Sequence, residues 1–133
     1  MKILMMDHNG LQLQTRKMLL EEEIEGSVDT AITLADLHIA LKKEKYDVII
    51  IDHLIENGQK CVDYILINDP MQPILVVSDA IQCVITHCQD CVKYHNIRRL
   101  SNPTSIRNII RLVKGFQHYT CDHYDQETLK ITI

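Results

Sequence analysis

Short apolar segments alternate with amphipathic segments along most of the chain. The clearest apolar segment is Val48 to Ile51, an unbroken run of β-branched residues that ends at the carboxylate of Asp52. A continuous apolar run this short, bounded by charged residues, is typical of a strand buried on both faces of a parallel sheet. The segments between such runs carry apolar residues at helical spacing. The pattern predicts strands at 2–6, 28–31, 48–51, 74–78 and 97–100, and helices at 11–23, 34–43, 61–67, 81–94 and 104–116.

This alternation predicts an α/β domain with a five-stranded, parallel, doubly wound sheet and five helices. Several predicted strands end in a small polar residue: Asp7, Asp52, Ser78 and Asn102 follow or close four of them. In open α/β sheets, ligands bind beyond the carboxyl ends of the strands. The four side chains are therefore expected at one edge of the sheet, around a single site.

Composition narrows the class of protein. The chain has 133 residues and a formal net charge of -4, which disfavours direct binding of nucleic acid by this domain. No apolar run is long enough to span a membrane, and Asp7 interrupts the N-terminal apolar run too early for a signal peptide. The five cysteines are scattered, as is typical of reduced thiols, so we expect a cytoplasmic protein.

The strand-end residues, together with Pro103 after Asn102, resemble those of the receiver domains of two-component response regulators, over residues 1–117. The resemblance implies a flavodoxin-like strand order of 2-1-3-4-5. It also implies roles for individual residues. These are Asp52 as phosphoacceptor, Ser78 as switch hydroxyl, Asn102 as a phosphate contact, Pro103 as a cis-proline, Asp7, His8 and Asp52 as the acidic pocket, and Asp7 with Asp52 as a weak magnesium site.

Four positions depart from the receiver pattern. His8 replaces an acid, Asn102 replaces a lysine, Asp79 stands where a small residue is usual, and Glu56 replaces a proline. Two carboxylates hold Mg²⁺ less firmly than three, and phosphoryl transfer to an aspartate depends on cations around the phosphoryl oxygens. We therefore expect a receiver that is phosphorylated weakly or not at all.

The resemblance implies a sensor histidine kinase as a partner and signal output through a protein surface. In receivers, that surface comprises the elements predicted at 81–94, 97–100 and 104–116, which would contact a second copy or an output domain. Basic residues gather there: Arg98, Arg99, Arg107, Arg111 and Lys114. A solvated basic face is the simpler interpretation. Residues 118–133 alternate near their end and fit either an extra edge strand or the start of an output module, such as a DNA-binding one.

A second function is kept open by a cluster of thiols and imidazoles in the segment 81–94 and just beyond it. The cluster comprises Cys83, His87, Cys88, Cys91 and His95. Cys88 and Cys91 have CxxC spacing, which suits a metal- or redox-sensing domain on the same fold. However, no second CxxC pair follows, and free cysteine often serves as a small buried apolar residue. An enzyme is not expected, because the chain has neither a glycine-rich phosphate loop nor an evident nucleophile–base pair.

Overall fold

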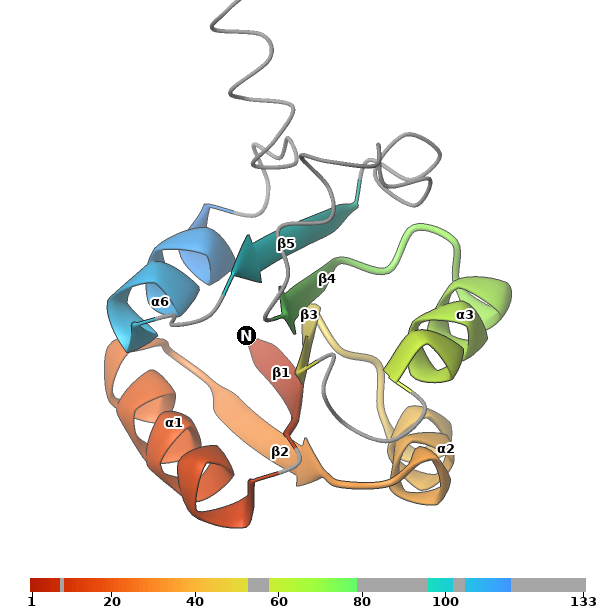
Figure 1. The fold of residues 1–133 in the computed structure, drawn as a ribbon, viewed down its shortest axis with the longest axis horizontal. Coiled ribbons are helices and arrows are strands. Elements are labelled where there is room, and N and C mark those ends of the chain that lie inside the picture. Colours follow the sequence, from red (N-terminus) through yellow and green to blue (C-terminus); the bar gives the residue numbers. More distant parts are fainter. Residues whose placement is uncertain (8, 53–57, 79–95, 102–104, 116–133) are drawn as a thin grey trace, which may run out of the picture.

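The computed structural model describes residues 1–7, 9–52, 58–78, 96–101 and 105–115. Within these ranges, the five strands form one parallel sheet in the order β2-β1-β3-β4-β5, as predicted (Figure 1). The elements are β1 Lys2–Met6, α1 Gly10–Glu23, β2 Ser27–Ala31, α2 Leu34–Lys43, β3 Val48–Asp52, α3 Gly58–Asn68, β4 Ile74–Ser78, β5 Ile97–Ser101 and α6 Ile106–Lys114. The helix predicted at 81–94 and the extension 118–133 lie outside the described ranges. No helix among the described residues is long and apolar enough to cross a membrane.

Helices cover both faces of the sheet, which explains why its strands are apolar on both sides. Helices α1 and α6 lie on one face, and α2 and α3 lie on the other (Figure 1). Side chains alternate between faces along a strand, so Ile49 and Ile51 of β3 join the core beneath α2 and α3. Val48 and Ile50 join the core beneath α1 and α6. The unbroken apolar run of β3 follows from this double burial.

Two helix starts test the sequence-based boundaries. Helix α2 begins with a capping box, which the sequence shows as a threonine followed three residues later by a carboxylate. Thr33 Oγ1 accepts a hydrogen bond from the Asp36 N–H at 3.1 Å, and the Asp36 carboxylate accepts one from the Thr33 N–H at 3.2 Å. Helix α6, predicted to begin at residue 104, begins slightly later, at Ile106. Ser105 is its N-cap, because the Ser105 hydroxyl accepts a hydrogen bond from the Asn108 N–H at 3.3 Å.

Helix α1 buries only part of its apolar side chains. Leu13 and Leu20 are buried, whereas Leu11 and Met18 are largely exposed. The helix ends in an acidic run at 21–23, whose last two residues are exposed. Glu21 is half-buried, and its Oε2 accepts a hydrogen bond from the Val28 N–H at 3.0 Å. That bond joins the end of α1 to the edge strand β2.

Candidate functional site

The carboxyl edge of the sheet brings together three of the predicted strand-end residues. Strands β1 and β3 pair in parallel with Met6 opposite Ile51, so Asp7 and Asp52 are the next residues at the same edge. Strand β4 ends beside them at Ser78. The predicted shared position of these three residues is confirmed. Other predicted members of the site fall in parts of the chain that the structure does not describe: His8, Glu56, Asp79, Asn102 and Pro103.

Both carboxylates at this edge are almost completely buried. The exposed fraction is 1% for Asp7 and 2% for Asp52. A buried carboxylate needs hydrogen bonds or an opposite charge, because moving it out of water costs several kcal/mol. The contacts of Asp7 are therefore central to the chemistry of the site.

Asp7 accepts hydrogen bonds from donors in the turn and helix that follow β1. Its Oδ1 accepts a hydrogen bond from the Asn9 N–H at 2.9 Å. Its Oδ2 accepts one from Gln12 Nε2 at 2.8 Å and forms an ion pair with Arg16 Nη1 at 3.3 Å. The Arg16 side chain is only 12% exposed. The Asp7 carboxylate therefore has a guanidinium partner that is itself largely shielded from water.

Sequence reasoning missed Gln12 and Arg16 as members of the site, although their spacing was a usable signal. They are four residues apart, so they lie on the same face of α1. Arg16 also follows the buried Leu13 by three residues and precedes the buried Leu20 by four. It therefore lies in the stripe that faces the sheet, where a charged side chain requires a partner.

The magnesium site implied by the receiver resemblance fits this donor set poorly. Mg²⁺ prefers oxygen ligands in near-octahedral geometry and gives up its water reluctantly. Both oxygens of Asp7 already accept hydrogen bonds, one of them from a cation. Among the described residues there is no group of three or more His, Cys, Asp or Glu side chains that could hold a metal. Magnesium binding by Asp7 and Asp52 remains a prediction.

The basic residues predicted to line an interface differ in exposure, and Arg99 is half-buried. Arg107, Arg111 and Lys114 are exposed on α6. Arg98 is buried, with 8% of its surface exposed, and lies opposite Leu75 in the pairing of β4 with β5. The exposed residues on α6 are therefore the ones available to a partner, and the interface itself remains a prediction.

The described cysteine, Cys61, is a core residue. Its side chain is buried among the apolar residues beneath α2 and α3, and burial raises the pKa of its thiol. A protonated, buried thiol is inert. The cluster of Cys83, His87, Cys88, Cys91 and His95 lies in the segment that the structure does not describe, so metal or redox sensing there stays untested.

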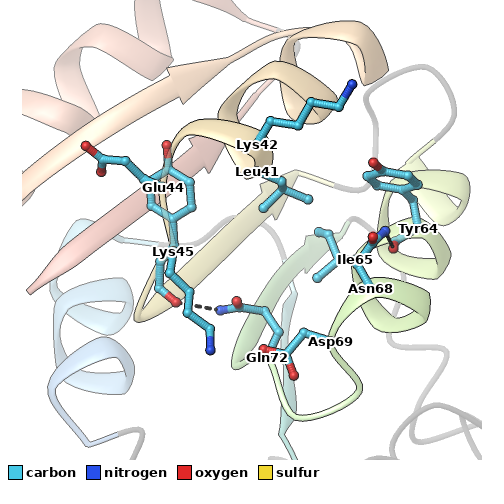
Figure 2. A pocket seen from close by; sticks show the side chains of 10 residues that line it. Leu41, Lys42, Glu44, Lys45, Tyr64, Ile65, Asn68, Asp69 and Gln72 are labelled. Carbon is cyan, nitrogen blue, oxygen red and sulfur yellow. Dashed lines mark hydrogen bonds between the residues drawn. The ribbon is translucent and has the colours of Figure 1, made fainter.

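A separate pocket lies near the amino ends of β3 and β4, away from Asp7 and Asp52. It has a volume of about 270 Å³ and lies between the C-terminal ends of α2 and α3 (Figure 2). Leu41 and Ile65 line it with apolar side chains. Gln72 also lines it and is 4% exposed, with Nε2 donating to the Tyr46 carbonyl oxygen at 3.1 Å. No residue of the predicted site belongs to this pocket.

Comparison with known proteins places the fold. No protein-family model matches the chain, and no curated protein matches it. Solved structures do match. A response regulator receiver domain from Clostridium thermocellum has a TM-score of 0.72 at 19% identity, covering 96% of this chain and 98% of that one. An adenylate cyclase structure from Rhodopirellula baltica has a TM-score of 0.74 at 20% identity, covering 98% and 94%.

A third similar structure is described as an atypical orphan response regulator with a phosphorylation-independent regulatory mechanism. It has a TM-score of 0.68 at 16% identity, covering 87% of this chain and 94% of that one. At these identities the similarity establishes the fold. The strand order, the helical layers and these matches agree with the resemblance found in the sequence. The chain has the CheY-like fold of response-regulator receiver domains.

Proposed function

We propose that this chain is a receiver-type signal-input domain that acts by contacting other proteins and depends little on phosphorylation. The observation that carries the proposal is the position of Asp52. It is buried at the carboxyl end of the central strand, beside the strand end that bears Asp7. A fold alone hosts many functions, so the argument depends on this site. Asp52 stands at the phosphoacceptor position of the receiver pattern.

A sensor histidine kinase is the proposed phosphoryl donor. An Asp52 carboxylate oxygen would attack phosphorus as the bond from phosphorus to the histidine nitrogen breaks, so that the imidazole is the leaving group. Such a transfer requires cations around the phosphoryl oxygens. Three residues reduce the positive charge available there. His8 replaces an acid that would hold a metal ion, Asn102 replaces a lysine, and Asp79 adds a negative charge. The phosphorylated state is therefore disfavoured.

The proposed output is a protein–protein contact through β5, α6 and the neighbouring segment 81–94. The exposed residues Arg107, Arg111 and Lys114 give the α6 part of this surface a positive charge. We propose a second copy of the chain or an output domain as the partner, with no catalytic turnover and no direct nucleic-acid contact. The segment 118–133 would connect to that output, and the protein would act in the cytoplasm.

Phosphorylation is tested with the small donor phosphoramidate and Mg²⁺, followed by intact-protein mass. We expect the wild type to gain a phosphoryl group on only a small fraction of molecules, and Asp52→Asn to gain none. The oligomeric state, measured by light scattering, should be the same with and without the donor. Complete phosphorylation of Asp52 that changes the oligomeric state would contradict a phosphorylation-independent domain.

The output surface is tested by reversing charge on α6. Arg107→Glu combined with Arg111→Glu should weaken self-association of the chain in sedimentation velocity experiments. Lys42→Glu combined with Lys43→Glu, on the far face of the sheet at the end of α2, is the matched control and should leave association unchanged. Equal association of both double variants would exclude α6 from the contact. Metal content and thiol titration of the purified wild type test the alternative at Cys83, Cys88 and Cys91.

A further inference from the structure

We propose that Arg16 is a built-in counterion of the acidic pocket, so that its guanidinium serves in place of a bound divalent cation. This inference rests on the proposed function, because it assumes that the Asp7 and Asp52 edge corresponds to a receiver's acidic pocket. Arg16 is not part of the receiver pattern, and its positive charge would be a permanent part of the pocket.

The first support is the geometry of the ion pair. Arg16 Nη1 lies 3.3 Å from Asp7 Oδ2, with side-chain exposures of 12% and 1%. Gln12 Nε2 donates to the same oxygen at 2.8 Å. Water and salt screen a pair this buried only weakly. Its two charged groups therefore attract each other more strongly than the groups of an exposed pair do. The guanidinium therefore competes directly with any metal ion for Asp7.

The second support is that Asp7 also holds the start of α1. Its Oδ1 accepts a hydrogen bond from the Asn9 N–H, while Asn9 Oδ1 caps the helix by accepting one from the Gln12 N–H at 3.1 Å. Gln12 in turn donates from its side chain to Asp7. The three residues form a closed ring of hydrogen bonds. Turning the Asp7 carboxylate toward a metal ion would break this ring as well as the ion pair.

The charge balance explains the consequence for signalling. Arg16 brings one positive charge to Asp7, whereas a bound Mg²⁺ would bring two. A phosphoryl group entering the pocket would therefore meet less positive charge, and the guanidinium is already engaged with Asp7. With this counterion in place, the domain is expected to keep one conformation whether or not Mg²⁺ is present.

The test is a titration with Mg²⁺, and separately with Mn²⁺, followed through backbone amide NMR signals. The wild type should show no Mg²⁺-dependent shifts and no selective Mn²⁺ broadening at Asp7 or Asp52 up to about 10 mM. Arg16→Met should bind at least about tenfold more tightly than the wild type, since a positive charge beside the Asp7 carboxylate is removed. Lys17→Met removes the same charge from the next residue of α1 and should behave like the wild type.

Thermal unfolding supplies a second measurement. The melting temperature of the wild type should be the same in EDTA and in Mg²⁺, while that of Arg16→Met should be lower in EDTA and rise with Mg²⁺. If Arg16→Met does not fold in either buffer, the wild-type titration decides alone. Mg²⁺ binding by the wild type at millimolar or lower concentration would overturn the inference.

The outcomes for this inference and for the proposed function are distinguishable. Arg16→Met is also treated with phosphoramidate and Mg²⁺. If it gains Mg²⁺ binding, and Asp52 accepts no phosphoryl group at all in either the wild type or the variant, the counterion role of Arg16 is supported and the assignment of Asp52 as phosphoacceptor is contradicted. If the wild type itself binds Mg²⁺ tightly and is phosphorylated, the counterion role is overturned and the receiver assignment stands.

Discussion

The two ends of the sheet carry similar charged groups in different surroundings. At the carboxyl edge, Asp7 is 1% exposed and is held by Arg16 and Gln12. Near the amino ends of β1 and β3, Lys2 Nζ lies 3.4 Å from Asp29 and 3.2 Å from Glu44. Those side chains are 28%, 43% and 46% exposed. The distances resemble that between Arg16 and Asp7, but water reaches one set and is excluded from the other.

This difference in burial changes what each contact contributes. Exposed ion pairs typically add less than about 1 kcal/mol, because water and salt screen them. Removing one partner of a buried pair costs about 3–5 kcal/mol, because the remaining charge stays buried without compensation. The contacts at the amino end therefore contribute little to the free energy of unfolding, whereas the contacts of Asp7 contribute much more. Substitutions at both ends can test this contrast.

The largest effect is expected for Asp7→Ala. It leaves the largely buried guanidinium of Arg16 and the side chain of Gln12 without their acceptor, so the free energy of unfolding should fall by about 3 kcal/mol. Glu44→Ala, at the amino end, should cost less than about 1 kcal/mol. Urea denaturation measures both. An Asp7→Ala variant as stable as the wild type would show that Arg16 does not compensate this carboxylate.

Gln72→Met tests whether the loss of stability depends on burial of the substituted side chain or on the end of the sheet at which it lies. Gln72 is at the amino end but 4% exposed, and its Nε2 donates to the carbonyl oxygens of Tyr46 and Pro73. Methionine has a similar volume and cannot donate, so the variant should lose about 2 kcal/mol of unfolding free energy. Gln14→Met, at an exposed position of α1, is the control. Similar stabilities of the two variants would contradict the burial argument.

Tyr46→Phe removes a hydrogen bond that is partly shielded. The Tyr46 hydroxyl donates to Asp29 Oδ2 at 2.8 Å, and this bond is the main reason that the pKa of Asp29 lies below its ordinary value. A lowered carboxyl pKa gives stability that is present above the ordinary pKa and is lost as the pH falls through the pKa of the folded state. The variant should lose about 1 kcal/mol at neutral pH and depend less on pH in the acid range.

The matched control for that change is Tyr64→Phe, which removes the same atom from a ring stacked on His38. Its acid unfolding should follow that of the wild type. NMR titration of the Asp29 carboxyl gives the direct measurement, and its pKa should rise in Tyr46→Phe alone. An unchanged Asp29 pKa would rule out the hydroxyl as the cause of its shift.

The smallest effect is expected for Glu44→Gln. The Glu44 side chain is nearly half exposed, and its hydrogen bond to Lys2 is the main reason that the pKa of Lys2 is raised. The unfolding free energy should change by less than about 0.5 kcal/mol, and by less still in high salt. Glu22→Gln, at an exposed position of α1, is the comparison. If Glu44→Gln lost as much unfolding free energy as Asp7→Ala, the two ends of the sheet would not differ in what their charged contacts contribute.

The sequence by itself determined which of the described segments form strands and which form helices. It also placed Asp7, Asp52 and Ser78 at a shared edge of the sheet. These follow from local patterns: apolar runs that suit double burial, helical spacing between them, and polar residues where strands end. The Thr33 capping box was readable for the same reason, since its donors and acceptors are three residues apart. The strand order came from the resemblance to receivers.

Only the tertiary structure decided which side chains bind the buried carboxylate of Asp7. Arg16 and Gln12 reach Asp7 because α1 packs with that face against the sheet, and Glu21 meets Val28 because the edge strand β2 lies beside the end of α1. Gln72 bonds to Tyr46 across 26 residues of sequence. Periodicity shows which face of a helix is buried, but it does not show which groups that face meets. Those partners depend on how the elements pack, and they decide which donors and charges lie beside Asp7.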